Sequence, residues 1–285
     1  MKQRMISGVI AAFLFALALT FRDSIGFNIA ISILSIIAIW EIFVATKYMN
    51  NKLLLTVCMI FAGCVPFFRN PYFTIARNTA CFIFVLLIFS VMLYERKTIT
   101  LEQIGLIFML VLIIPFAFSS LIYLKDLPSE LNSRNYMAKD GLFFVLLAAF
   151  GAWVTDMGAY FVGKFFGKHK LAPTISPKKT IEGAAGGVVL NLVVYIIAGF
   201  IWQAMVVDGH GGVQIIPLAF VAILASLIAM LGDLSASFIK RSCHIKDFGN
   251  IMPGHGGVLD RFDSILLVAP FLYIVLQYIP IIERF

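Results

Sequence analysis

Apolar residues are gathered along the chain into long runs that short polar segments separate. A helix that crosses the roughly 30 Å hydrocarbon core of a bilayer needs about 20 mostly apolar residues. Nine candidate runs can be marked between charged residues, glycines and prolines. They are Met5 to Phe21, Phe27 to Thr46, Leu53 to Phe68, Thr79 to Tyr94, Ile104 to Leu124, Gly141 to Val162, Gly183 to Met205, Val213 to Leu231, and Ile265 to Ile282. The pattern therefore predicts an all-α fold, a polytopic integral membrane protein with about nine transmembrane helices.

Composition strengthens this interpretation. Hydrophobic residues make up 61% of the 285 residues and charged residues 13%, whereas soluble domains are about 45–50% apolar. The net charge of +7 comes from basic residues in short loops, where membrane orientation and anionic lipid headgroups account for it. The chain is therefore expected to have the lipid bilayer as a partner and no nucleic acid. The four cysteines have no metal-binding spacing and are interpreted as small apolar fillers.

The distribution of basic residues predicts the orientation. With nine spans and a cytoplasmic N-terminus, 15 of the 22 lysines and arginines fall on the cytoplasmic side, and the C-terminus lies on the far side. The two most polar loops, Gly163 to Glu182 and Asp233 to Ser264, then share the cytoplasmic side. We predict a transmembrane scaffold over residues 1–140 and a region over 141–285 that carries both loops. The expected location is the cell (inner or plasma) membrane, with the active site facing the cytoplasm.

Two carboxylates close to the last span suggest a metal site. Asp260 and Asp263 stand three positions apart, so a helix that begins near Val258 would project both from one face. Like charges so placed repel unless a cation lies between them, and hard oxygen ligands suit Mg²⁺. The alternative is that Arg261 and Lys246 pair with these acids as salt bridges.

A third carboxylate favours the metal. Asp233 follows the apolar run that ends at Leu231, so it is expected at the membrane boundary, where an unpaired carboxylate is costly. If the eighth and ninth helices pack side by side, Asp233 meets Asp260 and Asp263. Asp247 in the connecting loop is a fourth candidate ligand, and the alternative for it is a solvated loop acid.

The glycine-rich turn before the last span is a candidate phosphate site. Gly256 and Gly257 follow Pro253, and their backbone can approach a phosphate while the start of the helix adds partial positive charge. His255 is placed to donate to a phosphate or a leaving group, or else only satisfies the local turn. The basic residues ahead of this turn are Lys240, Arg241 and Lys246. They suit the phosphates of a nucleotide and an anionic lipid headgroup equally well.

The other polar loop has a similar character. Asp156 lies deep in the sixth predicted span, and the segment from Ser176 to Glu182 resembles the start of a helix, which fits anion capture. The polar residues of this segment are Ser176, Lys178, Lys179, Thr180 and Glu182. Alternatively, its lysines serve only to hold the loop in the cytoplasm.

Two stretches of the chain resemble the characteristic blocks of one enzyme family. The first runs from Ser237 to Asp263 and reads, in order, Lys240-Arg241, Lys246-Asp247, Pro253, His255-Gly256-Gly257 and Asp260-Arg261-Phe262-Asp263. The second runs from Asp156 to Gly183 and contains Ser176-Pro177-Lys178-Lys179-Thr180 and Glu182-Gly183. The first closely resembles the signature of the phosphatidate cytidylyltransferases, also called CDP-diacylglycerol synthases. The second is similar to the family's other block, whereas the N-terminal half resembles the family only as a set of apolar spans.

The resemblance implies an integral membrane enzyme of phospholipid biosynthesis. It implies that CTP and phosphatidate are converted into CDP-diacylglycerol and pyrophosphate, with Mg²⁺ required and K⁺ as a candidate second ion. The implied catalytic residues are Asp233, Lys246, His255, Asp260 and Asp263, and the three aspartates among them, with Asp247 as a further candidate, would form the metal centre. The implied substrate-binding residues are Asp156, Ser176, Lys178, Lys179, Thr180, Glu182, Lys240, Arg241, Gly256, Gly257 and Arg261. A homodimer is kept as a candidate assembly.

Two other functions compete with this one. A CTP-dependent polyprenol or lipid-alcohol kinase shares the membrane setting, the nucleotide and the metal, but it transfers the γ-phosphoryl group. An ion-coupled transporter is suggested by the acids within apolar runs, namely Glu41, Asp156 and Asp233, since such acids often mark ion paths. A transporter would not need the basic, glycine-rich loops. Apart from Glu41, the first five spans contain no acid and are interpreted as scaffold.

Overall fold

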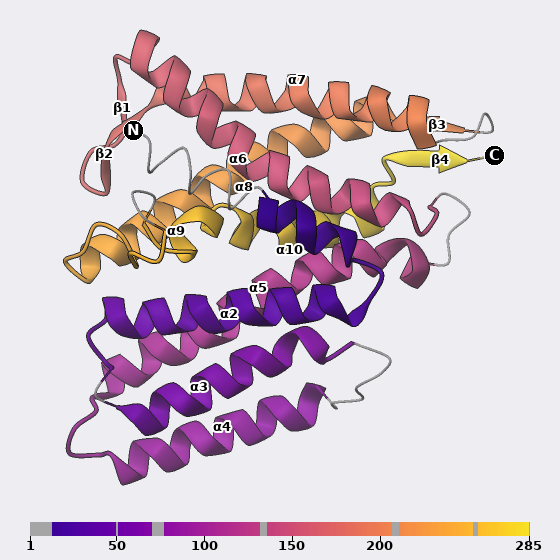
Figure 1. Cartoon of the computed structure of the whole chain (residues 1–285). Helices are drawn as coiled ribbons and strands as arrows, with labels where there is room; N and C mark the ends of the chain where they lie inside the picture. The colour runs from indigo at the N-terminus through magenta and orange to yellow at the C-terminus, as the bar shows by residue number, and fades with distance from the viewer. Residues whose placement is uncertain are drawn as a thin grey trace. The chain divides into compact units, whose positions relative to one another are not determined.

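The chain is arranged as two compact units, each built from segments that are distant in sequence. The computed structural model describes residues 13–49, 51–69, 77–131, 136–206, 211–252 and 256–284. The first unit comprises Met1–Ile122 and Cys243–Arg261, and the second comprises Tyr123–Ser242 and Phe262–Phe285. Figure 1 labels the elements of both. The signature stretch is thus shared between the units, because residues 243–261 return to the N-terminal segment.

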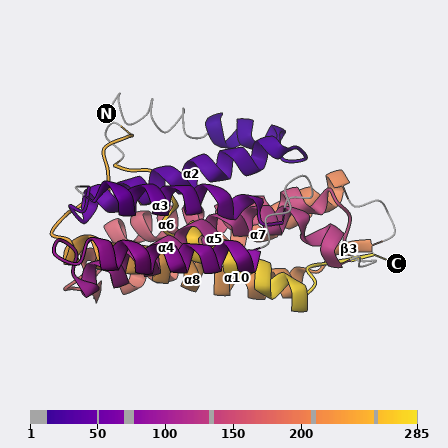
Figure 2. The same ribbon diagram turned by 90° about the horizontal axis from the view of Figure 1, so that it is seen from below.

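Helices of the first unit pack through aromatic rings and buried side-chain hydrogen bonds. These helices are α2 (Ile25–Ala45), α3 (Lys52–Cys64) with the 3₁₀ turn η1 (Val65–Phe67), α4 (Arg77–Tyr94) and residues 101–122 of α5 (Leu101–Leu131). In the chain order, α2 packs on α3 and α3 on α4, as Figures 1 and 2 show. The ring of Phe61 stacks on that of Phe84 at 4.0 Å between centroids. Asn28 Nδ2 donates to the Pro66 carbonyl at 2.7 Å, which fixes α2 against η1.

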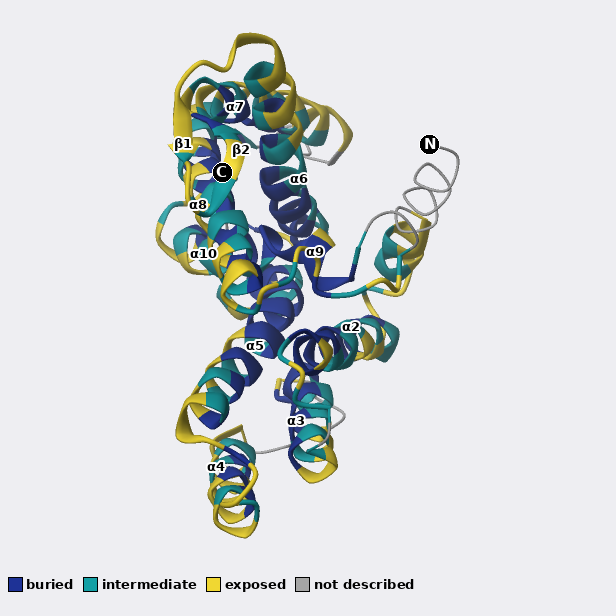
Figure 3. Cartoon of the chain, turned by 90° about the vertical axis from the view of Figure 1, so that its left-hand side faces the viewer, coloured by how far each residue is buried: buried dark blue, intermediate teal, exposed yellow. Residues whose placement is uncertain are grey.

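The second unit is a bundle arranged around α6. Its helices are α6 (Asp140–Phe166), α7 (Ile181–Val206), α8 (Ile215–Ser242) and α10 (Ile265–Tyr278), and α6 packs on each of the other three. Figure 3 shows that much of α6 is buried. A Cβ at Gly158 would lie 2.9 Å from the Gly186 carbonyl oxygen and 3.0 Å from Gly187 Cα, so glycines allow α6 and α7 to approach closely.

Two small two-stranded sheets were not predicted. Strand β1 (Lys170–Ala172) pairs antiparallel with β2 (Ser176–Thr180), and β3 (Gly211–Val213) pairs antiparallel with β4 (Ile282–Arg284). The prediction of a helix start across residues 176–182 was therefore wrong for the first five residues, because the chain stays extended until α7 begins at Ile181. The last predicted span is also shorter than expected, since α10 ends at Tyr278.

A buried ion pair fixes the end of the chain within the second unit. The Arg284 guanidinium donates from Nη1 to Asp140 Oδ2 at 2.6 Å and from Nη2 to Oδ1 at 3.0 Å. Trp202 Nε1 donates to the same Oδ1 at 3.0 Å, and the Met137 backbone N–H to Oδ2 at 2.7 Å. The side chain of Asp140 is 0% exposed and that of Arg284 8%. Strand β4 is thereby tied to the start of α6.

Several of these helices are suited to a bilayer. Within the described ranges, six helices are long and apolar enough to cross a membrane, namely α2, α4, α5, α6, α7 and α8, and the apolar segments Lys52–Phe67 and Ile265–Tyr278 are shorter. The first predicted span falls partly outside the described residues, and its residues 13–20 are helical. The all-α, polytopic membrane class is confirmed, while the count of nine spans and the orientation remain predictions.

Candidate functional site

A cluster of charged side chains lies within the bundle of the second unit. The Lys179 ammonium, at the end of β2, forms an ion pair with the Asp233 carboxylate on α8. Lys240 Nζ, two helical turns further along α8, lies 3.8 Å from Asp263 Oδ2. The Lys240 and Asp263 side chains are only 11% and 10% exposed. Each acid thus has a lysine as a partner, in surroundings where water screens charge weakly.

A third acid joins this cluster from α6. The Ser264 hydroxyl donates to Asp156 Oδ2 at 3.0 Å. Asp156 also lies within electrostatic reach of Asp233, Asp263 and Lys179. The second unit therefore brings together Asp156 of α6 and Lys179 of β2 with Asp233, Lys240 and Asp263.

Helix α8 is longer than its apolar run. Asp233 was predicted at the membrane end of the helix, but α8 continues through a polar last turn to Ser242. Asp233 and Lys240 are seven positions apart, two helical turns, and therefore project from the same face. The extension is what places Lys240 near Asp263. Arg241 also belongs to this last turn, and it is exposed.

Two residues of the predicted substrate loop have structural partners. The Thr180 hydroxyl accepts the Gly183 N–H at 3.1 Å and so caps α7, which begins one residue later. The Glu182 carboxylate accepts the backbone N–H groups of Lys168 at 3.0 Å and His169 at 3.2 Å, and it also pairs with His169 Nδ1 at 2.6 Å. These contacts fix the β1–β2 hairpin to α7 and so present Lys179. Ser176 is half-buried and Lys178 exposed on the same strand.

The predicted helix that carries both signature aspartates is interrupted. Helix α9 spans only Leu259–Phe262, and α10 begins at Ile265, so Asp263 lies in the turn between them. The expectation of one continuous helical face for Asp260 and Asp263 was therefore wrong. In the ranges that the structure describes, no group of three or more His, Cys, Asp or Glu side chains is arranged to hold a metal ion. The metal centre of Asp233, Asp260 and Asp263 stays a prediction.

Asp260 organises the turn that precedes it in the first unit. Its Oδ2 accepts the Phe248 N–H at 2.8 Å and the Gly257 N–H at 2.9 Å, and the residue is 8% exposed. Gly256 has a φ of +84°, a conformation that glycine adopts without strain, and a Cβ there would lie 2.9 Å from Asp260 Oδ2. The glycines therefore let the chain fold closely around a carboxylate.

Glu41 accepts hydrogen bonds from the turn before Asp260, a role that was not predicted from the sequence. This fully buried residue of α2 accepts the Val258 N–H on Oε1 and the Leu259 N–H on Oε2, both at 2.8 Å. Backbone donors that were expected to meet a phosphate thus donate to carboxylates. The available signal was that Glu41 is the lone acid of the first five apolar runs, which had been assigned to scaffold.

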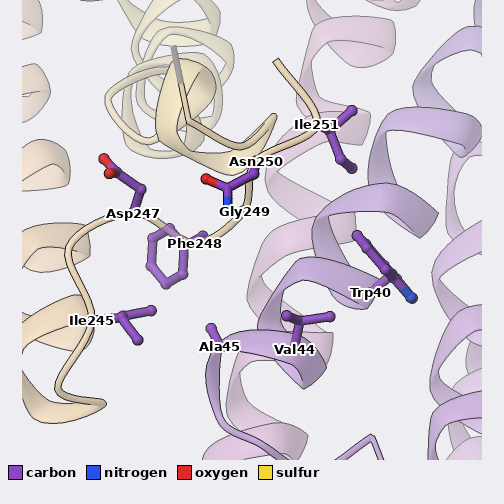
Figure 4. Close-up of a pocket in the computed structure, with 9 residues that line it drawn as sticks. All are labelled: Trp40, Val44, Ala45, Ile245, Asp247, Phe248, Gly249, Asn250 and Ile251. Carbon is purple, nitrogen blue, oxygen red and sulfur yellow. The ribbon is translucent and has the colours of Figure 1, made fainter. Parts of the chain in front are cut away.

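A pocket of about 450 Å³ opens beside this turn in the first unit. Figure 4 shows α2 on one side of it and the loop that follows residue 244 on the other. The lining residues are Trp40, Val44, Ala45, Ile245, Asp247, Phe248, Gly249, Asn250 and Ile251. The pocket is mostly apolar, with Asp247 and Asn250 as its polar side chains.

The remaining predicted residues divide by exposure. Lys246, Asp247 and Arg261 are exposed, as expected for groups that would meet charged substrates. His255 lies outside the described residues. Burial raises the pKa of the Cys243 thiol and so disfavours its thiolate form.

The fold and the cluster define an integral membrane protein that holds paired carboxylates and lysines among its helices. A model of the cytidylyltransferase family matches residues 2–279, and the chain belongs to that family. It is 36% identical over 282 residues to a phosphatidate cytidylyltransferase of Bacillus subtilis (strain 168), with 97% of each chain covered. It is also 47% identical over 137 residues, 48% of this chain and 50% of the relative, to the protein of that name from Staphylococcus haemolyticus (strain JCSC1435).

Proposed function

We propose that the protein is a phosphatidate cytidylyltransferase, which converts CTP and phosphatidate into CDP-diacylglycerol and pyrophosphate in phospholipid biosynthesis. The observation that carries the proposal is the 36% identity to the Bacillus subtilis relative of that name across 97% of both chains. The acid and lysine cluster of the second unit supports it, because both substrates carry phosphates. The apolar helices supply the setting in which the diacylglycerol tails of phosphatidate remain in the bilayer.

The proposed reaction is an in-line transfer of a cytidylyl group. A phosphate oxygen of phosphatidate attacks the α-phosphorus of CTP and forms a new P–O bond. The bond from the α-phosphorus to the bridging oxygen breaks, and its electron pair leaves with pyrophosphate. Negative charge grows on that leaving group, so groups that are positioned beforehand to neutralise it account for most of the rate enhancement.

Lys179 and Lys240 are the lysines of the acid and lysine cluster in the second unit. Lys179 Nζ is buried and makes no hydrogen bond beyond its ion pair with Asp233 among the described residues. An ammonium group has three donors, so Lys179 retains donors for phosphate oxygens. Lys178, Arg241, Lys246 and Arg261 are exposed and would guide the two anionic substrates toward the cluster. His255 is proposed as a donor to the leaving group.

Magnesium is the proposed cofactor. Asp233, Asp260 and Asp263 would hold it, with Asp247 as a further candidate, because their hard carboxylate oxygens are the donors that Mg²⁺ takes. When bound, the ion would offset charge on the phosphates of CTP. Few protein ligands suffice, since Mg²⁺ in nucleotide sites is commonly held by one or two carboxylates plus substrate oxygens. A monovalent second ion such as K⁺ is proposed with it.

The proposed location is the cell membrane with the site on the cytoplasmic side, and a homodimer is the proposed assembly. The excess of lysine and arginine in alternate loops supports the orientation. Single cysteines placed in the β1–β2 hairpin of a cysteine-free variant should react with an impermeant maleimide in inside-out vesicles and be protected in intact cells. The opposite labelling would reverse the proposed orientation.

The position of the radiolabel in CTP tests the function directly. Purified protein in detergent–lipid micelles is incubated with phosphatidate and with CTP labelled at the α- or the γ-phosphorus, with Mg²⁺ or with EDTA. We expect α-label in the lipid and γ-label in pyrophosphate, both only with Mg²⁺. Incorporation of γ-label into a lipid alcohol would instead identify a kinase. If CTP is not consumed under any of these conditions, the proposed activity is wrong.

A further inference from the structure

Glu41 is a carboxylate placed within an apolar helix and yet fully hydrogen-bonded. It is 0% exposed, and each of its oxygens accepts one backbone N–H, from Val258 and Leu259, at 2.8 Å. A buried carboxylate is costly unless such donors compensate it. The compensation comes from residues more than 200 positions later in the chain. Val258 precedes α9 and Leu259 is its first residue, so both lie immediately before Asp260.

Three consecutive backbone donors at this point are divided between two acids. Glu41 accepts those of Val258 and Leu259, and Asp260 accepts that of Gly257. The two carboxylates are close enough to interact electrostatically, and their charges repel. With the α9 backbone held by Glu41, the side chain of Asp260 turns back toward Gly257 and Phe248. The orientation of Asp260 therefore depends on Glu41.

Two glycines, Gly249 and Gly257, lie very close to the Glu41 carboxylate. A Cβ at Gly249 would lie 2.6 Å from Glu41 Oε1, and a Cβ at Gly257 would lie 2.5 Å from both Glu41 oxygens. Contacts this short essentially never occur for real side chains. The segments at Gly249 and Gly257 thus approach the same carboxylate so closely that a larger residue at either position would displace it. The loop is shaped around Glu41 from two sides.

We propose that Glu41 is a positioning residue of the reaction: it holds the backbone at residues 257–259 and thereby sets the orientation of Asp260. It touches no substrate. The part of this inference that concerns turnover rests on the proposed cytidylyltransferase function, whereas the part that concerns the turn does not.

Amide exchange tests the contact without using the reaction. Glu41→Gln keeps the size of the side chain but presents an amide NH₂ to one of the two N–H donors, and Glu41→Ala removes both acceptors. Asn28→Ala is the matched control, because Asn28 is a buried polar residue of α2 that fixes the helix to η1 and does not touch the turn. By mass spectrometry, we expect faster exchange in peptides covering residues 248–262 of Glu41→Gln. Peptides of α10 should be unchanged, and Asn28→Ala should leave the turn protected.

Kinetics then separate positioning from general destabilisation. With labelled CTP and saturating phosphatidate, Glu41→Gln should lower kcat on the order of tenfold, the rate equivalent of one charge-assisted hydrogen bond. Because Glu41 touches no substrate, KM for both substrates should stay within about twofold. Asn28→Ala should melt earlier and keep kcat.

Two results would overturn the proposal. One is unchanged exchange at residues 248–262 in both Glu41 variants, which would show that Glu41 does not hold the turn. The other is a loss of kcat that Asn28→Ala shares at equal loss of thermal stability, which would reduce Glu41 to a general structural role. If the wild-type protein forms no CDP-lipid, the proposed function fails, and the exchange experiment still decides whether Glu41 holds the turn.

Discussion

Replacement of Asp140 offers a sharp test of how the second unit is held together. Its carboxylate is fully buried and accepts two hydrogen bonds from Arg284, one from Trp202 and one from the Met137 backbone. Asp140→Leu would leave the 8% exposed Arg284 guanidinium without this carboxylate. Breaking a buried ion pair by removal of one partner costs about 3–5 kcal/mol. At about 2–4 °C per kcal/mol for a domain of this size, Tm should fall by about 6–20 °C.

The double variant Asp140→Leu with Arg284→Met separates the charge from the packing. An apolar pair of similar volume removes the uncompensated charge. The fall in Tm of the double variant should therefore be much smaller than the sum of the falls in the two single variants. The assay is the loss of helical circular dichroism on heating in detergent, with KM for CTP measured at low temperature to show that the site persists. Single variants within about 2 °C of wild type, or strictly additive losses, would refute the assignment of Asp140 and Arg284 as the anchor of the C-terminus.

Three further predictions concern the site. Asp260→Ala or Asp263→Ala should reduce CDP-lipid formation by about 100-fold or more while the protein still inserts and folds; wild-type-like turnover would remove that aspartate from the proposed metal centre. Lys179→Ala should raise KM for at least one substrate about tenfold, as expected for one lost charge-assisted contact, and normal KM values for both substrates would remove Lys179 from the site. Gly257→Ala should lower kcat and raise amide exchange in residues 248–262, because the new Cβ would lie 2.5 Å from the Glu41 oxygens; unchanged exchange would show that the turn relaxes freely.

The sequence predicted the helices well because each helix that crosses a membrane needs a long run of apolar residues, and such runs are visible in the sequence. Runs of about 20 apolar residues have few structural solutions in lipid, so the positions of most spans could be predicted to within a few residues. The grouping of Lys179, Asp233, Lys240 and Asp263 was also accessible, since the alternation of spans placed their loops on one side. The membrane side that these loops share remains a prediction.

Other features depend on contacts with segments that are distant in sequence, and the local sequence pattern does not reveal these contacts. The polar end of α8 up to Ser242 looks like a loop in a hydropathy profile, yet it stays helical. The three-residue strands β1, β3 and β4 form only where a partner strand lies beside them. The break after Phe262 separates two acids that have helical spacing. Glu41 was visible as an isolated acid, but nothing near it in the sequence indicates the backbone donors that it binds.

The separation of Glu41 from its donors has a consequence for biosynthesis. At about 5–20 residues per second, Val258, which lies 217 positions after Glu41, is synthesised roughly 10–40 s later. During that interval α2 is in the nascent protein without these donors, and Glu41, four residues before the end of the helix at Ala45, is an uncompensated acid in an apolar segment. The hydrogen bonds to Glu41 can therefore form only after the segment with Val258 and Leu259 has been synthesised. Completion of the first unit is coupled to completion of the chain, and a product that ends before Val258 retains a helix with an uncompensated acid.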